Sequence, residues 1–153
     1  MRELEVVGVR VETPSNQPLV LLREVNSDRF LPIWIGAVEA AAIAFAQQRE
    51  PSPRPLTHEL MHRIIEALGD SLDTVQIDNV EDGVFYATLH FASGATVSAR
   101  PSDSIALALR TRTRIEASEF VLDEAGMVMP VDEDEEVQKF REFLAEVEPE
   151  DFT

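Results

Sequence analysis

Two short stretches of the sequence bring together residue types that could hydrolyse an ester or amide bond. Residues 100–103 read Arg-Pro-Ser-Asp, and residues 58–62 read His-Glu-Leu-Met-His. In the first stretch, Arg100 could hold a phosphate while Asp103 binds a divalent cation or acts as a base, a combination suited to a nuclease. Asp103 at the start of a helix also complements the helix dipole, so Ser102 and Asp103 can equally be explained as capping residues.

The second stretch matches the His-Glu-x-x-His pattern, in which two histidines on one helical face bind zinc and the glutamate acts as a base. The longer pattern of many zinc peptidases is absent, because positions 65 and 68 are Ile and Leu. The remaining histidine, His90, lies in an expected strand, and nothing specifies Glu81 or Asp82 as a third ligand. We therefore keep a zinc peptidase only as a minor alternative to a solvated helix face.

Further charged residues could contact an anionic substrate. Arg112 and Arg114 would point the same way in an extended segment, where they could contact phosphate or neutralise an acidic tail. Arg110 lies at the expected end of a helix, where the dipole favours a cation. Glu39 is the only charge in the segment AVEAAAIAFA, so its carboxylate needs a partner, an interface or a cleft.

Composition limits the classes of function. The chain has 153 residues, 44% of them hydrophobic, and no cysteine, which predicts one domain without disulfides or thiolate metal sites. The formal net charge of −16 argues against nucleic-acid binding through bulk electrostatics, because that affinity comes from Lys and Arg. Ten of the acids lie within residues 132–151, so the rest of the chain can still form a local arginine patch.

The sequence predicts neither export nor membrane contact. Residues 1–12 alternate charged and apolar side chains, whereas a signal peptide has a continuous apolar core. No apolar run reaches the length of a membrane-spanning helix. We therefore expect a cytoplasmic protein.

Apolar periodicity and turn residues predict the elements that must position these side chains. Residues 3–12 should form a strand and residues 19–35 a β-hairpin, with Pro32 at an edge or bulge. An almost wholly apolar helix should follow Gly36, in the core or at a subunit contact. Thr57 is expected to cap a helix at 58–68 that ends at Gly69. The apolar stripe of this helix is Leu60, Met61, Ile64, Ile65 and Leu68.

The second half should contain three antiparallel strands within residues 71–99, joined by hairpin turns at 81–83 and 93–94. Ser102 is the expected N-cap of a helix at 103–110, followed by a short strand at 114–118 and a turn of helix. Apolar residues at helical spacing predict an amphipathic helix from Glu135. We predict an α+β fold with a mixed, mainly antiparallel sheet, a compact domain at 1–131 and an acidic C-terminal helix and tail at 132–153.

Four ordered blocks of the sequence resemble the bifunctional nuclease family. These blocks are FLPIWIGAVEAAAIA, RPLTHELM, DGVFYATL and ARPSDSIALALR, and the similarity covers roughly residues 3–130. The resemblance implies a compact domain of helices and strands that self-associates as a homodimer or higher homo-oligomer. It also implies nuclease activity toward DNA and RNA, as in plant members of the family.

The resemblance also points to site residues. The polar positions that the family shares correspond to Glu39, Arg54, Thr57, His58, Arg100, Ser102 and Asp103. The family block does not require histidine at position 62, which weakens the zinc-peptidase alternative further.

We therefore predict a weak, metal-assisted phosphodiesterase acting on single-stranded nucleic acid. Asp103 and Glu39 would bind Mg²⁺ or Mn²⁺, and His58 would serve as acid or base. The predicted substrate contacts are Arg54, Arg100, Ser102, Arg112 and Arg114. The alternative from another class is a non-catalytic, dimeric binding or regulatory module, which the net charge of −16 favours.

Overall fold

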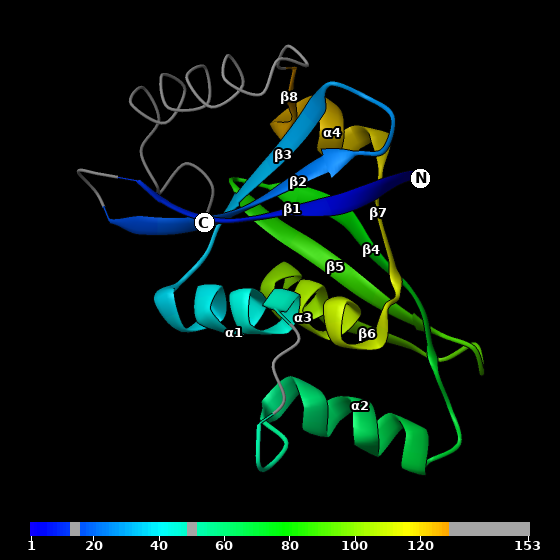
Figure 1. Ribbon diagram of the computed structural model, residues 1–153. Coiled ribbons are helices and arrows are strands. Elements are labelled where there is room, and N and C mark those ends of the chain that lie inside the picture. Colours follow the sequence, from blue (N-terminus) through cyan, green and yellow to red (C-terminus); the bar gives the residue numbers. More distant parts are fainter. Residues whose placement is uncertain (13–15, 49–51, 129–153) are drawn as a thin grey trace.

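The computed structural model describes residues 1–12, 16–48 and 52–128, and Figure 1 shows how their helices and strands are arranged. The strands are β1 Arg2–Glu12, β2 Gln17–Glu24, β3 Arg29–Trp34, β4 Leu72–Glu81, β5 Val84–Phe91, β6 Thr96–Ala99, β7 Arg114–Ala117 and β8 Met127–Val128. The helices are α1 Ala37–Gln48, α2 Thr57–Ala67, α3 Pro101–Thr111 and α4 Glu119–Ala125.

All the described strands belong to one sheet with the order β6-β5-β4-β7-β1-β2-β3-β8. Every neighbouring pair is antiparallel except β4 and β7, which are parallel. Parallel strands need a long crossover connection, and here the crossover from β4 to β7 runs through β5, β6 and α3. The predicted α+β fold with a mixed, mainly antiparallel sheet is confirmed.

Helix α3 is the buried helix on which the rest of the helical layer packs. It contacts α1 and α2 on one side and β4, β5 and β7 on the other, as Figure 1 shows. Small residues let it approach these neighbours closely, and the buried hydroxyl of Ser104 donates to the carbonyl of Arg100 at 2.8 Å. Its buried side chains are Pro101, Ser102, Ser104, Ile105, Ala106, Leu107 and Ala108.

The predicted hairpins and sheet edge are confirmed. Asp82 and Gly83 both have positive φ angles, of 53° and 78°, as a tight two-residue hairpin turn requires. Strand β8 pairs with β3 only at Arg29 and Phe30, so among the described residues Pro32 lies on an unpaired stretch of edge. The predicted C-terminal helix and its boundary at 131/132 lie outside the described residues. No helix in the described part of the chain is long and apolar enough to cross a membrane.

The two predicted N-caps are wrong. Thr57 is the first residue of α2, whose N-cap is Leu56, and Ser102 lies inside the first turn of α3, whose N-cap is Arg100. Neither cap makes a side-chain hydrogen bond. In α3 the cause is Pro101, because its fixed φ angle suits the first helical position and starts the helix before the serine.

Two of the five residues of the predicted apolar stripe of α2 pack within the chain. Met61 and Ile65 pack against the core, whereas Leu60, Ile64 and Leu68 are 47%, 49% and 80% exposed. No side chain of this helix is buried. An apolar surface of this kind on one helix face is typical of a contact with another chain.

Arginines tie β1 and β3 to α4 through a shared carboxylate. Arg29 donates to Glu24 at 2.9 Å and to Glu119 at 3.1 Å, and Arg2 also donates to Glu119. The hydrogen bonds from Arg2 and Arg29 hold the pKa of Glu119 below its usual value. A carboxyl group with a lowered pKa stabilises the fold above its unfolded pKa, and this contribution is lost as the pH falls through the folded pKa.

We therefore expect Glu119→Gln to lower the melting temperature at pH 7 and to have little effect at a second pH chosen below the lowered folded pKa of Glu119, where the wild-type carboxyl is itself protonated. Thermal unfolding followed by circular dichroism at both pH values measures this difference. Glu124→Gln, on the same helix, is the control and should change neither value. An equal loss for Glu119→Gln at both pH values would rule out the charged network as its cause.

Candidate functional site

Side chains from the first turns of three helices meet at one place on the structure. Glu39 lies in the first turn of α1, His58 in the first turn of α2, and Asp103 in the first turn of α3, which follows Arg100. Helix N-termini present unpaired N–H groups and the positive ends of helix dipoles, which favour anions. We call these four residues the polar cluster, and all four are among the predicted site residues.

His58 and Asp103 form the part of the polar cluster that could move a proton. Nε2 of His58 lies 3.2 Å from Oδ1 of Asp103, and the two side chains are 14% and 37% exposed. A carboxylate in this position orients the imidazole ring and fixes its tautomer. The other ring nitrogen can then give a proton to a bound substrate or take one from it.

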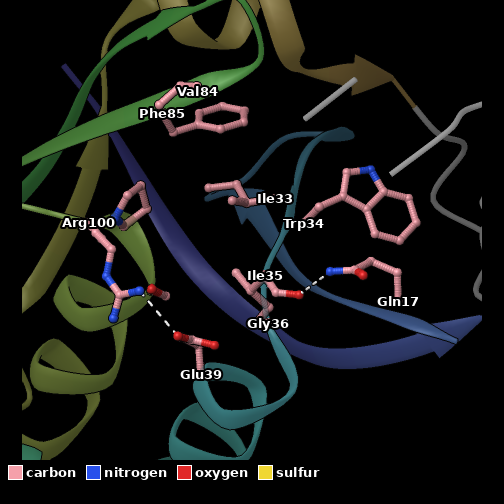
Figure 2. A pocket seen from close by; sticks show the side chains of 11 residues that line it. Gln17, Ile33, Trp34, Ile35, Gly36, Glu39, Val84, Phe85 and Arg100 are labelled. Atoms are coloured by element: carbon pink, nitrogen blue, oxygen red, sulfur yellow. Dashed lines mark hydrogen bonds and ion pairs between the residues drawn. The ribbon is translucent and has the colours of Figure 1, made fainter. Parts of the chain in front are cut away.

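Arg100 joins the two carboxylates of the cluster. Its guanidinium lies 3.0 Å from Oδ2 of Asp103 and donates to Oε1 of Glu39 at 3.1 Å, which Figure 2 shows as a dashed line. Asp103 first and Glu39 second raise the pKa of Arg100 through these hydrogen bonds and charges. We expected the carboxylate of Glu39 to need a partner because it lies on an apolar helix, and Arg100 is that partner. The same ion pair links α1 to Arg100, the N-cap of α3.

This arrangement bears on the predicted metal site. Arg100 lies between Glu39 and Asp103, where its positive charge opposes a cation that both carboxylates would share. The described residues contain no group of three or more His, Cys, Asp or Glu side chains that could hold a metal ion. As arranged, these residues do not fit a shared divalent cation. Binding of Mg²⁺ or Mn²⁺ by Glu39 and Asp103 stays a prediction that requires Arg100 to move.

The His-Glu-x-x-His motif does not assemble as a zinc site. His58 faces Asp103, while Nε2 of His62 lies 2.8 Å from Oε1 of Glu66 one turn along α2. The third histidine, His90, lies on β5 opposite Thr74 of β4. Each motif histidine therefore has its own carboxylate partner, and the geometry gives the zinc-peptidase alternative no support.

A cavity of about 350 Å³ opens beside His58. We call it the His58 cavity. One part of its wall is polar and includes the whole polar cluster, and the other part is apolar. Its lining residues are Val38, Glu39, Ala42, Phe45, Leu56, Thr57, His58, Arg100, Asp103 and Arg110.

A second cavity of about 310 Å³ is also lined by Arg100 and Glu39 and is shown in Figure 2. We call it the Phe85 cavity. Ile33 and Trp34 of β3 and Val84 and Phe85 of β5 line it, and the view shows the Phe85 ring facing Ile33. Both cavities share Glu39 and Arg100, so one ligand could contact the two cavities across this ion pair.

The other predicted substrate contacts do not join the polar cluster. Arg54 is exposed in the segment before α2 and lines neither cavity, whereas Ser102 is buried and lines the Phe85 cavity. Arg112 is the left-handed C-cap of α3 with φ 56°, and Arg114 pairs with Glu116 at 3.4 Å. The expected extended strip at 112–114 is therefore wrong, because the helix continues to Thr111.

The sequence did not single out Arg110 as a site residue. It lies seven positions after Asp103 on α3, which is close to two full helical turns, so both side chains lie on one face. Its guanidinium lies over the ring of Phe45, with Cζ 5.6 Å from the ring centroid. The seven-residue spacing could have linked Arg110 to Asp103, but the helix dipole already explained the presence of a cation at position 110.

Comparison with known proteins decides the family of this chain. The model of the bifunctional nuclease domain matches residues 20–130. The chain belongs to the bifunctional nuclease family. Membership of this family indicates a function related to nucleic acid.

Two relatives of the family member described here are uncharacterized proteins of Mycobacterium tuberculosis. One is from strain CDC 1551 / Oshkosh and the other from strain ATCC 25618 / H37Rv. Each is 53% identical over 161 residues, and the alignment covers 99% of this chain and 98% of the relative.

Proposed function

We propose that this protein is a phosphodiesterase that cleaves single-stranded nucleic acid, with His58 and Asp103 as its acid–base pair. The observation that carries this proposal is the 3.2 Å contact between His58 and Asp103 in the wall of a cavity that also contains Arg100. A proton-transfer group and a cation on one cavity wall are the parts that phosphodiester hydrolysis requires.

The chemistry assigns one role to each member of the polar cluster. His58 would take a proton from the attacking water, whose oxygen forms the new bond to phosphorus. The imidazolium would then give a proton to the leaving oxygen as the original P–O bond breaks. Asp103 would hold the ring and offset its charge, while Arg100 and the helix N-termini would stabilise negative charge on the phosphate. Glu39 would position Arg100.

The Phe85 cavity supports a single-stranded substrate. Ile33, Trp34 and Phe85 give it an apolar wall, and Gln17 and Ser102 supply polar atoms. An unstacked base binds well to a pocket with this composition, whereas a base inside a duplex cannot reach it without being extruded. The phosphate next to that base would then lie near Arg100.

The test is cleavage of labelled DNA and RNA oligonucleotides by protein purified from a nuclease-deficient host. Single strands and matched duplexes are compared in Mg²⁺, in Mn²⁺ and in EDTA. We expect single strands to be cut faster than duplexes. Activity that requires Mg²⁺ or Mn²⁺ would support the predicted metal role, and activity in EDTA would assign the step to the protein side chains. No cleavage under any condition would contradict the proposal.

One observation favours a second function. The charges of Arg100, Glu39 and Asp103 are paired with one another, and the whole chain has a net charge of −16. A non-catalytic binding or regulatory module could use the same two cavities without a reaction. In that case oligonucleotides would bind without being cleaved, and the affinity would fall steeply with salt if phosphates are contacted.

We also propose that the protein forms a homodimer through the exposed stripe of α2. Its side chains at four-residue spacing are Leu56, Leu60, Ile64 and Leu68, and they are 53%, 47%, 49% and 80% exposed. A stripe of this kind can pack against the same stripe of a second copy related by a two-fold axis. Glu59 and Arg63 beside it pair with each other within the helix at 3.5 Å.

Replacing Leu60 and Ile64 together by Glu should convert the dimer into a folded monomer, because two charges would lie in the apolar contact. Light scattering after size-exclusion chromatography measures the mass. Val97→Glu, an exposed valine on β6, is the control and should leave the mass unchanged. A monomeric wild-type protein, or a double variant that remains dimeric, would contradict the proposal that α2 forms the dimer contact.

A further inference from the structure

We propose that Arg110 is the phosphate-binding residue of the His58 cavity, where it takes the charged oxygens of a phosphate monoester or diester. This inference rests on the proposed function for the substrate class, but its evidence comes from the surroundings of Arg110. It assigns a ligand contact to Arg110, which the sequence analysis explained only as a cation at the end of a helix.

The first observation is that Arg110 has donor capacity that the protein does not use. Its Nε is buried and has no hydrogen-bond partner among the described residues. None of the ion pairs formed within the described part of the chain includes Arg110. A buried donor without a partner costs free energy, so a residue that keeps one is a candidate for binding a ligand.

The second observation is that the guanidinium of Arg110 is held in place. The ring of Phe45 lies under it at 5.6 Å, and both side chains line the His58 cavity. Stacking on an aromatic ring leaves the edge of the guanidinium, with its N–H groups, available for an anion. A planar group fixed in this way loses little freedom on binding two phosphate oxygens.

The third observation is the difference between the two arginines of the cavity. Arg100 is paired with Glu39 and Asp103, so its charge is already offset. Arg110 therefore supplies the arginine charge in the His58 cavity that forms no ion pair with a described carboxylate. Ala42 and Phe45, two partly buried apolar neighbours, limit the access of water to this charge, which strengthens its attraction for an anion.

The spacing along α3 then relates the phosphate to the reacting groups. Asp103 and Arg110 lie on one face of the helix, two turns apart, and His58 contacts Asp103 at 3.2 Å. All three residues line the His58 cavity, so a phosphate bound to Arg110 would lie in the same cavity as the imidazole of His58. The carboxylates of Glu39 and Asp103 line the same cavity and would repel the phosphate, which favours a position close to Arg110 and away from them.

The experiment is titration of the full-length protein with inorganic phosphate and with a 5′-mononucleotide at constant ionic strength, followed by NMR chemical shifts. Arg110→Gln should weaken the binding of both at least about tenfold, because a charge-assisted pair of hydrogen bonds is lost. Arg112→Gln removes the same charge from an exposed position at the end of the same helix and should change the affinity less than twofold. Arg110→Lys should bind with intermediate affinity, since lysine keeps the positive charge but loses the planar guanidinium that can donate two hydrogen bonds to one phosphate.

Equal affinities for Arg110→Gln and Arg112→Gln, or a wild-type protein that does not bind either ligand, would overturn the inference. If Arg110→Gln unfolds, Phe45→Leu replaces it, because loss of the ring should weaken phosphate binding severalfold in a folded protein. Phosphate binding that depends on Arg110 without any cleavage would support this inference and contradict the phosphodiesterase. Cleavage that continues at the wild-type rate in Arg110→Gln would support the phosphodiesterase and contradict this inference.

Discussion

Asp103→Asn should lower the rate of oligonucleotide cleavage by about 100-fold to 10,000-fold, the range over which acid–base groups contribute. Asparagine keeps the size and shape of the side chain but removes the negative charge. That charge lies 3.2 Å from Nε2 of His58 and pairs with Arg100. The fold should be retained, because the side chain is 37% exposed and packs in no core cluster.

The control for this variant is Asp123→Asn, which removes the same charge from an exposed position on α4. Its cleavage rate should equal that of the wild type. The double variant of His58→Ala and Asp103→Asn should be no slower than the slower single variant, because the two residues act as one unit. Multiplicative losses in the double variant would show instead that the two residues act separately.

Leu107→Ala should lower the free energy of unfolding by about 2–5 kcal/mol, the usual range for a buried leucine that leaves a cavity. Leu107 is fully buried, with 0% exposure, at the centre of α3. Val97→Ala also shortens an apolar side chain, at a position on β6 that is 48% exposed and outside the proposed dimer contact, and it should change stability by only about 1 kcal/mol or less.

Urea unfolding followed by tryptophan fluorescence and circular dichroism measures both values, provided the slopes match the wild type. Similar stabilities for Leu107→Ala and Val97→Ala would contradict the placement of α3 at the centre of the core. This helix also holds Arg100, Asp103 and Arg110, so a loosened α3 should reduce cleavage even though Leu107 lies outside both cavities.

Sequence patterns predicted the strands and hairpins well, because alternation and turn residues act over a few neighbouring positions. They predicted helix starts less well. The hydroxyls of Thr57 and Ser102 suggested caps, but Pro101 fixes the start of α3 one residue before the serine. The apolar face of α2 was visible in the sequence, yet nothing in the sequence showed that Met61 would pack inward and Leu60 outward.

The candidate site was predicted as a set of residues but not as a geometry. Glu39 and His58 lie 61 and 45 positions from their partners Arg100 and Asp103, so no local spacing links them. Resemblance to a family supplied the set, and the packing of α1 and α2 on α3 brings it together. Arg110 was missed because a cation at a helix C-terminus already has a sufficient electrostatic explanation.

Chemical rescue of His58→Ala tests the central claim most directly. The variant and the wild type are purified in parallel from a nuclease-deficient host, and cleavage of a single-stranded oligonucleotide is measured with and without added imidazole. We predict that His58→Ala loses nearly all activity and that imidazole restores part of it in the variant while leaving the wild type unchanged. A variant that cuts as fast as the wild type, or one that is inactive and does not respond to imidazole beside an active wild type, would contradict proton transfer by His58.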